Sequence, residues 1–280
     1  MSPIRLVALT GLAMVAFAGN SILCRLALRQ HEIDPASFTL IRLLAGAVVL
    51  SFIVYARPQR VPIAGNFLSA VALFVYAAGF SFAYVQLSTA MGALLLFGAV
   101  QATMIVYGFW IGERFRPIQL VGLGGAFAGL IGLLLPGLSA PPLWSAVLML
   151  SAGVAWGVYS LRGRGTGDAT AMTAGNFLRA TIFAVLLGVL WRTEARWSMS
   201  GVSYALASGA LASGVGYAVW YSVVRHLKAS YAATVQLSVP VLAAVAGWAF
   251  LGEAITLRIA LASLAILGGI ALVVLSRQRG

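Results

Sequence analysis

Residues 111–114 read IGER, and residues 251–254, 140 positions later, read LGEA. The Gly-Glu pair carries most of the weight, because the 280-residue chain has only six acidic residues and two of them, Glu113 and Glu253, fall at matching places. At the same shift, residues 87–135 align with residues 227–275. Further identical pairs are Leu87/Leu227, Ala93/Ala233, Gly129/Gly269 and Leu135/Leu275. An internal repeat in a very apolar chain is typical of secondary transporters.

The composition indicates a polytopic membrane protein. Hydrophobic residues make up 61% of the chain and charged residues 9%, and the mean hydropathy is +0.99, whereas a soluble domain is roughly 25% charged. A helix that spans a bilayer needs about 20 apolar residues. The sequence predicts ten such helices: 5–29, 36–55, 66–86, 89–111, 117–135, 143–161, 171–191, 201–224, 229–251 and 257–276. Their short connections leave no room for an extramembrane active site.

The ten predicted helices divide into two repeats of five, residues 1–137 and 138–280. Because five is odd, the second repeat enters the membrane with the opposite orientation, which makes an inverted-topology repeat. The turn-forming segment PGLSAPP at 136–142 separates the two. The predicted fold class is therefore an all-α integral membrane bundle.

The net charge of +12 does not indicate nucleic-acid binding, because the basic residues are scattered over helix ends and form no patch. The positive-inside rule explains them better. With the N-terminus in the cytoplasm, the inside segments hold Arg5, Arg57, Arg60, Arg114, Arg116, Arg162, Arg164, Arg225, Lys228, Arg277 and Arg279, and the outside segments hold Arg29, Arg192, Arg196 and Arg258. This distribution predicts that both termini are cytoplasmic and that the chain is a multi-pass protein of the cell inner membrane.

Aromatic residues recur on shared helix faces near the middle of several predicted spans. They are Tyr76, Phe80 and Tyr84 on one helix, Tyr217, Trp220 and Tyr221 on another, and Phe97, Trp156 and Tyr159 on two more. Taken singly, each ring is explained by packing in the core or against lipid. As a group, they favour the wall of a cavity for an apolar or aromatic ligand. Trp110, Trp144, Trp191 and Trp197 lie at helix ends and read as an interfacial belt.

Uncharged polar residues inside the spans are candidates for ligand binding, because polar groups are costly there. They are Asn20, Gln101, Gln236 and Ser238. Each is suited to an amino group or a carboxylate, and hydrogen bonding between helices is the alternative. Pro240 is expected to break the ninth helix near its middle, as a hinge or a plain kink.

Four charged residues form symmetry-related pairs near opposite membrane faces: Arg42 with Arg179, and Glu113 with Glu253. Each arginine is expected to snorkel to lipid headgroups or to reach a gate partner or a carboxylate in the cavity. The two glutamates are expected to cap helices or form gate salt bridges rather than transfer protons. No acidic residue lies mid-helix, so the sequence offers no evident proton carrier. Facilitated diffusion, coupling through an unidentified group and sodium coupling all stay open.

Small residues recur on two of the predicted helices: Gly122, Gly125 and Gly129 in 117–135, and Ala265 and Gly269 in 257–276. Small residues four apart allow helices to approach closely. The stripes predict packing inside the bundle, with a dimer seam as the alternative.

With these motifs the chain resembles the drug/metabolite transporter superfamily and, within it, the EamA family of duplicated five-helix units. The residues that carry the resemblance are the segment FAGN at 17–20, Arg42, Arg179 and the repeated Gly-Glu. The second repeat departs from the family pattern, with Ala254 where arginine is frequent. The resemblance implies alternating access around a central cavity lined by the first, third, fourth, sixth, eighth and ninth helices, with the fifth and tenth peripheral. Exporters of aromatic amino acids are the most similar group.

The expected function is export of amino acids, aromatic ones included, and of other small amphipathic metabolites. The expected partners are the small-molecule substrate and membrane lipid, with no nucleic acid, cofactor or metal, in a monomer or homodimer. An exporter of toxic compounds or a flippase for lipid-linked substrates is the alternative within the superfamily. An intramembrane enzyme is not expected, because His31 and His226 lie at opposite faces and no catalytic cluster is seen. A scaffold without transport would not need a polar, aromatic cavity.

Overall fold

The computed structural model describes residues 1–58, 61–112, 116–135, 140–163, 167–227, 232 and 235–276, with side chains up to residue 274. Within these ranges the regular secondary structure is helical, apart from an isolated bridge between Ile33 and Trp197, and short turns and irregular segments connect the helices. Nine described helices are long and apolar enough to cross a membrane, and a tenth apolar helix is shorter. The predicted all-helical membrane fold is confirmed.

The first repeat contains five helices, α1 (Pro3–Arg29), α2 (Pro35–Tyr55), α3 (Phe67–Tyr84), α4 (Thr89–Trp110) and α5 (Pro117–Leu134). The second repeat begins with α6 (Leu143–Arg162) and α7 (Ala169–Leu190), followed by the short 3-10 helix η1 (Arg192–Glu194). One continuous span then comprises α8 (Met199–Ala207), the π-helical segment η2 (Ser208–Val215) and α9 (Gly216–Val224). The final two helices are α11 (Ser238–Leu251) and α12 (Leu257–Ser276).

Local capping signals explain where several helices begin and end. The Asp34 carboxylate accepts hydrogen bonds from the backbone N–H groups of Ala36 and Ser37, at 3.0 and 2.9 Å, and Pro35 is the first residue of α2. Asp168 caps α7 in the same way. Gly112 and Gly252, the repeated glycines, both follow their helices with positive φ angles of 86° and 62°. The sequence repeat is therefore also a repeat of helix endings.

The eighth span of the sequence differs from expectation, because it holds eight residues of π-helix that no sequence pattern indicated. The ninth span is interrupted close to Pro240, where a break was predicted. Residues 235 and 236 are helical, Leu237 is a turn, and α11 begins at Ser238, so Pro240 lies in the first turn of α11. Proline fits there because first-turn N–H groups have no partner within a helix.

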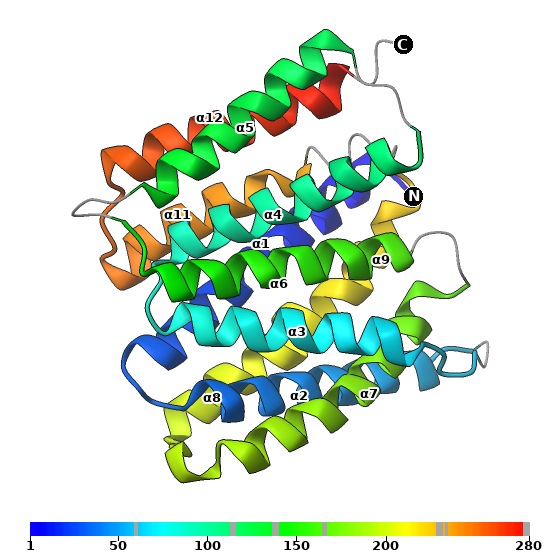
Figure 1. The fold of residues 1–280 in the computed structure, drawn as a ribbon. Coiled ribbons are helices and arrows are strands. Elements are labelled where there is room, and N and C mark those ends of the chain that lie inside the picture. Colours follow the sequence, from blue (N-terminus) through cyan, green and yellow to red (C-terminus); the bar gives the residue numbers. More distant parts are fainter. Residues whose placement is uncertain are drawn as a thin grey trace.

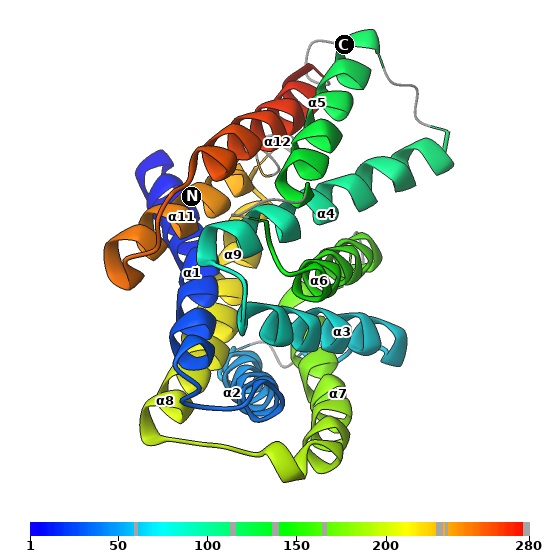
Figure 2. The ribbon, with the colours of Figure 1, turned by 60° about the vertical axis from the view of Figure 1, so that its left-hand side comes forward.

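The two repeats interlock, because the closest helix pairs join one repeat to the other. Helix α2 packs on α7, α3 and α4 pack on α6, α1 packs on α8, α9 and α11, and α5 packs on α12. In Figures 1 and 2 the α5–α12 pair lies at one edge of the bundle, and α2, α7 and α8 lie at the opposite edge. The start of α1 and the end of α12 lie at the same end of the bundle (Figure 1). Each repeat thus buries its helices mainly against the other repeat.

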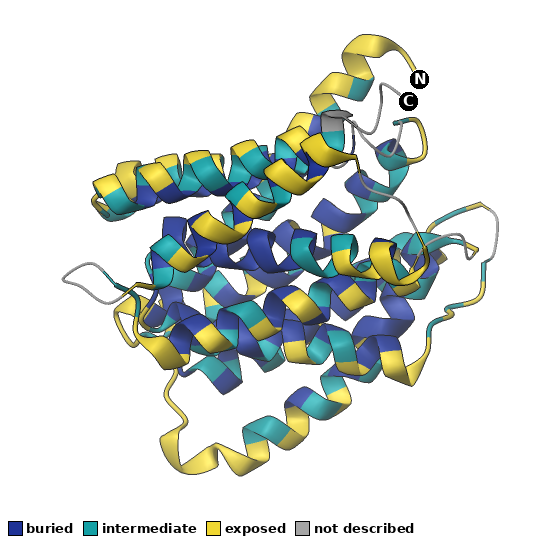
Figure 3. Ribbon diagram, turned by 45° about the horizontal axis from the view of Figure 1, so that its top comes forward, coloured by how far each residue is buried: buried dark blue, intermediate teal, exposed yellow. Residues whose placement is uncertain are grey.

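Buried residues form the inside of the bundle, and exposed apolar residues form an outer surface suited to contact with lipid. Buried positions concentrate where helices face each other, and exposed positions lie on the outer turns (Figure 3). Many exposed side chains are large and apolar, such as Phe52 and Trp248, as a lipid-facing surface requires. Trp110, Trp144 and Trp197 are 85%, 72% and 75% exposed at their helix ends, which fits an interfacial belt.

The small-residue stripes on α5 and α12 pack against each other within the chain. A Cβ built on Gly122 would lie 2.6 Å from the Gly269 carbonyl oxygen, and one on Gly129 would lie 2.8 Å from the Ala265 Cβ. The stripes therefore pack against each other inside the bundle. Because they face each other, they are not available to form a dimer seam.

Replacing Gly122 by alanine is expected to lower the apparent melting temperature in detergent by roughly 3 °C or more. Overpacking costs about 1–3 kcal/mol, and the obstructing atom belongs to the backbone of α12. Gly124→Ala is the matched control on the same helix, because nothing lies within 4 Å of its Cβ, and alanine favours a helix by ~1 kcal/mol. Equal melting temperatures for the two variants would contradict this packing.

Candidate functional site

Aromatic rings from both repeats meet at the centre of the bundle. Trp156 on α6 stacks on Tyr217 of α9, with ring centres 5.3 Å apart and planes 18° apart, and on Tyr159 at 5.3 Å. It also contacts Tyr76 of α3 at 4.8 Å. We call the connected set the aromatic cluster. Its members are Phe17, Tyr76, Phe80, Tyr84, Trp156, Tyr159, Phe177, Tyr217, Trp220 and Tyr221.

The four-residue spacing on α3 aligns three rings on one buried face. Tyr76 and Phe80 have ring centres 5.6 Å apart, and Phe80 and Tyr84 meet edge to face at 4.7 Å. Residues four apart lie one above the other on a helix, so this stripe follows from the sequence. All three side chains are buried. The rings contact each other, so a ligand entering here would have to separate them.

A chain of hydrogen bonds crosses the same region and joins four elements. The Ser208 hydroxyl in η2 donates to the side-chain oxygen Oδ1 of Asn20 on α1 at 2.6 Å, and Nδ2 of Asn20 donates to the Tyr76 hydroxyl at 3.4 Å. Nη2 of Arg42 on α2 donates to the same hydroxyl at 2.9 Å. The aromatic cluster therefore encloses a polar group whose members come from both repeats.

Arg42 is the most unusual member, because its charged side chain is 1% exposed. Its guanidinium carbon lies 4.9 Å from the Phe80 ring centre and 5.2 Å from that of Tyr76, within cation–π range. Its Nε and Nη1 atoms have no hydrogen-bond partner among the described residues. The expectation that Arg42 snorkels to headgroups is wrong, because its side chain is held inside the bundle.

Arg179, the repeat equivalent of Arg42, has a different environment. Its Nη1 donates to the backbone carbonyls of Ala64 at 3.0 Å and Gly175 at 2.9 Å. Its guanidinium carbon lies 5.7 Å from the Phe67 ring centre, and the residue is partly exposed. The two arginines are thus equivalent in sequence but not in their partners.

A second polar group lies beside Tyr159. The Tyr159 hydroxyl donates to Thr173 at 3.2 Å and accepts from the Asn176 amide at 3.3 Å. Thr173 in turn donates to the Tyr221 hydroxyl at 3.1 Å. These bonds join α6, α7 and α9, so both tyrosines expected in the cavity wall also connect helices.

Four other candidates lie outside these contacts. Phe97 and Gln101 are buried on α4, but within the described residues Phe97 has no ring contact with the aromatic cluster. Gln236 and Ser238 are partly buried just before and at the start of α11, where Ser238 donates to the Val235 carbonyl at 2.6 Å. The structure does not bring these four residues to the polar chain of Arg42.

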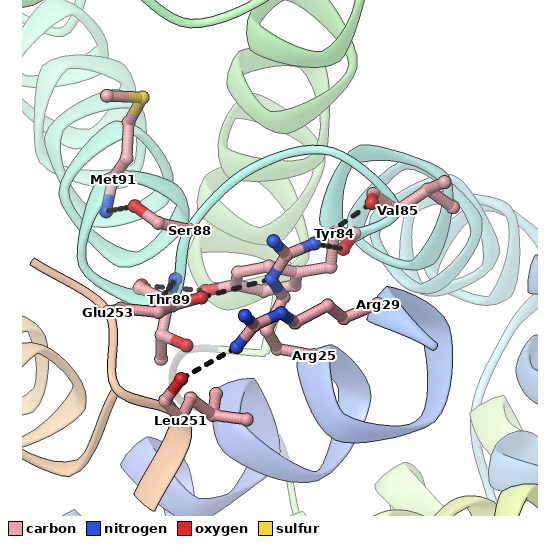
Figure 4. Close-up of polar contacts among 9 residues, drawn as sticks. All are labelled: Arg25, Arg29, Tyr84, Val85, Ser88, Thr89, Met91, Leu251 and Glu253. Atoms are coloured by element: carbon pink, nitrogen blue, oxygen red, sulfur yellow. Dashed lines mark hydrogen bonds and ion pairs between the residues drawn. The ribbon is translucent and has the colours of Figure 1, made fainter. Parts of the chain in front are cut away.

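One end of the bundle is closed by an ion pair between the repeats (Figure 4). Nε of Arg25 on α1 lies 3.0 Å from Oε1 of Glu253, and both side chains are about nine-tenths buried, at 12% and 11% exposure. Nη1 of Arg25 also donates to the carbonyls of Tyr84 and Val85, each at 2.9 Å. Oε2 of Glu253 accepts from the Thr89 N–H at 2.7 Å, at the start of α4. The carboxylate therefore caps α4 and joins three helices; Glu113, its repeat equivalent, lies outside the described residues.

The opposite end has its own polar contacts. Nη1 of Arg57 lies 2.6 Å from Oδ2 of Asp168, with side chains 33% and 29% exposed. Arg162 donates to Ser69 and Asn66, each at 3.2 Å. These contacts join α2 to α7 and α3 to α6. They are more exposed than the Arg25–Glu253 pair, so solvent screens them more strongly.

The loop before α2 is held to the segment before α8. Ser198 and Ser200 both donate to Oε2 of Glu32, and these hydroxyl groups hold the pKa of the Glu32 carboxyl below its ordinary value. Nearby, the Asp34 N–H donates to the Arg196 backbone carbonyl at 3.0 Å, and the Arg196 N–H donates to Oδ2 of the Asp34 carboxylate at 3.1 Å. This contact ties the first repeat to the second outside the membrane-spanning helices.

The sequence profile of the EamA-like transporter family matches residues 5–135 and again residues 143–275. The chain belongs to the EamA-like transporter family. Two matches in one chain agree with the two five-helix repeats, so this family member is a multi-pass membrane protein of a transporter family.

Relatives of this EamA-like chain include two proteins named as uncharacterized and one that is named for its substrates. The uncharacterized protein PA1977 of Pseudomonas aeruginosa is 54% identical over 274 residues, covering 98% of this chain and 96% of that protein. The uncharacterized transporter YoaV of Bacillus subtilis is 24% identical over 86% and 87% of the two chains. The threonine/homoserine exporter RhtA of Escherichia coli is 33% identical over 146 residues, which is 50% of this chain and 49% of RhtA. A solved crystal structure aligns over 100% of both chains with a TM-score of 0.71 at 19% identity, which shows a similar fold and nothing about function.

Sequence reasoning missed several residues of this site. Arg25 has no predicted role, although a charged residue inside an apolar span is itself a signal of function. Phe17 is predicted only as part of the FAGN segment, whereas in the structure its ring centre lies 5.6 Å from that of Tyr217. Ser208 carried no signal at all, because its role depends on the π-helical segment that places it beside Asn20.

Proposed function

We propose that this chain is an inner-membrane exporter of amino acids, aromatic ones and other small amphipathic metabolites included. The observation that carries the proposal is the aromatic cluster, which both repeats build around a buried polar chain. Such a site suits a ligand with an apolar body and one polar end, through ring stacking and burial. The amino acid class is also supported by the resemblance to RhtA, which is named for the export of threonine and homoserine.

The proposed mechanism is alternating access of the two inverted repeats. The two ends of the bundle are held by separate polar contacts, the Arg25–Glu253 pair at one and the Arg57–Asp168 pair at the other. Opening one pair while the other stays closed would expose the aromatic cluster to one side at a time. The distribution of basic residues assigns the Arg57 end to the cytoplasm and the Glu253 end to the outside.

The test is uptake of labelled tryptophan into liposomes that hold the purified protein, with and without an imposed pH gradient. Uptake without a gradient would support a facilitator for amino acids. Uptake only with the gradient would support transport but require a proton carrier. No uptake by folded protein in either condition would overturn the amino acid assignment and favour a toxic-compound exporter or a flippase.

Replacing Trp220 by alanine is expected to reduce the initial uptake rate by roughly tenfold. The Trp220 ring packs on Phe17, with centres 6.0 Å apart, at the edge of the aromatic cluster. An aromatic pair contributes about 0.5–1.5 kcal/mol beyond the area that it buries, and 1.4 kcal/mol corresponds to a tenfold change. Phe80→Ala should impair uptake as well, with its folding checked separately because Phe80 is fully buried.

The matched control is Trp248→Ala, because Trp248 is 62% exposed on the outer face of α11. Its removal should leave the uptake rate close to that of the unmodified protein. If the Trp220→Ala and Phe80→Ala proteins fold and transport normally, the aromatic cluster is not the substrate site.

A further inference from the structure

The guanidinium of Arg42 lacks the partners that a buried charge requires. A charged group removed from water is strongly destabilising unless it is paired and hydrogen-bonded. One nitrogen, Nη2, has a partner in the Tyr76 hydroxyl, whereas Nε and Nη1 have none among the described residues. The described ion pairs, Arg25–Glu253 and Arg57–Asp168, lie at the two ends of the bundle and do not include Arg42.

No carboxylate of the described chain is placed to neutralise Arg42. The described acidic residues are Glu32, Asp34, Asp168, Glu194 and Glu253, and each lies outside or at the end of a helix. Tyr76, whose hydroxyl accepts from Arg42, and Asn20, which donates to the same hydroxyl, are both neutral. The site therefore has an unpaired positive charge in its centre, enclosed by aromatic rings.

We propose that Arg42 binds the carboxylate of the transported substrate, and that the substrate class is amphipathic carboxylates, with or without an amino group. The inference rests on the proposed transport function and deepens it. A guanidinium donates charge-assisted hydrogen bonds to a carboxylate, and the free hydrogens on Nε and Nη1 are available for them. The rings of Phe80 and Tyr76, already in contact with the guanidinium, lie where the apolar body of such a ligand would pack.

The same geometry argues that an amino group is not what the site recognises. An ammonium group inside a protein needs a carboxylate or several carbonyl acceptors to replace its water. Beside Arg42, the side chains that join the polar chain are Tyr76, Asn20 and Ser208, none of which carries a negative charge. A cation would in addition be repelled by the guanidinium, so an amine without a carboxylate should be excluded.

Three indole compounds separate these possibilities. Tryptophan carries both groups, indole-3-propionate carries only the carboxylate, and tryptamine carries only the amine. Binding of labelled tryptophan to the purified protein is measured in competition with the other two. We expect indole-3-propionate to compete within about threefold of unlabelled tryptophan, and tryptamine to compete at least tenfold more weakly. Tryptamine competing as well as indole-3-propionate, or neither compound competing, would overturn the proposal.

Variants then test the residue itself. Arg42→Gln should weaken tryptophan binding at least tenfold and remove the preference for the carboxylate analogue. Arg42→Lys keeps the charge, so we expect weaker tryptophan binding with the preference for the carboxylate analogue retained. If Arg42→Gln does not fold, this variant tests the role of Arg42 in its place. Arg179→Gln is the matched control from the other repeat, because Arg179 donates to backbone carbonyls, and it should keep the preference. A folded Arg42→Gln protein with unchanged preference would refute the assignment.

Failure of the site and failure of the transport proposal give different results. Binding that depends on Arg42, without movement of tryptophan across liposomes, would leave the carboxylate site standing and overturn transport of this substrate. Transport that is indifferent to the Arg42 variants would leave the transport proposal standing and overturn the site.

Discussion

Replacing Glu253 by glutamine is expected to accelerate alkylation of Cys24 by a maleimide about tenfold or more. Cys24 is the single cysteine of the chain, it is 0% exposed, and it precedes Arg25 on α1. The Glu253 carboxylate holds Arg25 of α1 and the first N–H of α4. A hydrogen bond to a charged group contributes ~1.5–3 kcal/mol, and 1.4 kcal/mol shifts an equilibrium tenfold. Loss of the charge should therefore populate a state open at this end.

The measurement is the rate of Cys24 labelling in liposomes, with the folded state checked by gel filtration. Arg57→Gln provides the control, because it removes the ion pair at the opposite end and leaves the Asp168 cap of α7 in place. That variant should leave Cys24 protected from reagents added at the Glu253 end. Unchanged labelling in Glu253→Gln would mean that the pair contributes stability to the bundle without controlling access.

Replacing Gly209 by alanine is expected to cause a large loss of stability, because Gly209 lies directly against the backbone of α2. A Cβ at Gly209 would overlap the Arg42 carbonyl oxygen and lie 2.9 Å from the Ala45 Cβ. Backbone cannot yield as a flexible side chain does, so α2 and the π-helical segment would have to separate. Overpacking costs about 1–3 kcal/mol and occasionally more, which corresponds to a fall in melting temperature of roughly 5 °C or more.

The same substitution should also weaken substrate binding. Moving α2 away from η2 displaces Arg42 and Ser208 together, so tryptophan binding should weaken along with melting temperature. Gly132→Ala is the control, because no atom lies within 4 Å of a Cβ at that position of α5, and it should change neither quantity. A Gly209→Ala protein with native stability and binding would show that the two segments are not in close contact.

Much of the architecture could be predicted from the sequence because the signals are local. Apolar runs of membrane length and caps such as Asp34-Pro35 locate the helices to within a few residues for most spans. The repeated Gly-Glu places matching helix ends in both repeats, with positive φ at Gly112 and Gly252. The exception is the π-helical segment, which no local pattern indicates, whereas the interruption before α11 lies close to Pro240, where a break was predicted.

Which residues form the site could be predicted only in part. The stripe of Tyr76, Phe80 and Tyr84 follows from helical spacing, so it was visible in advance. Hydropathy does not tell an inner face from a lipid face, because in a membrane protein both are apolar. For that reason the positions of aromatic residues in the sequence predict both Phe97 and Trp156 for the cavity wall. Of the two, only Trp156 stacks on a ring of a neighbouring helix, that of Tyr217.

The sequence by itself determined that this chain spans the membrane as two related, oppositely oriented halves, since helix length, capping and repetition are properties of contiguous residues. Only the tertiary structure decided which charges meet. Arg25 and Glu253 are 228 residues apart and form an ion pair, whereas Arg42 and Arg179 share a place in the repeat but not a partner. The physical reason is that a buried charge is governed by the groups that neighbouring helices bring within hydrogen-bond distance, and that packing is not encoded in any one segment.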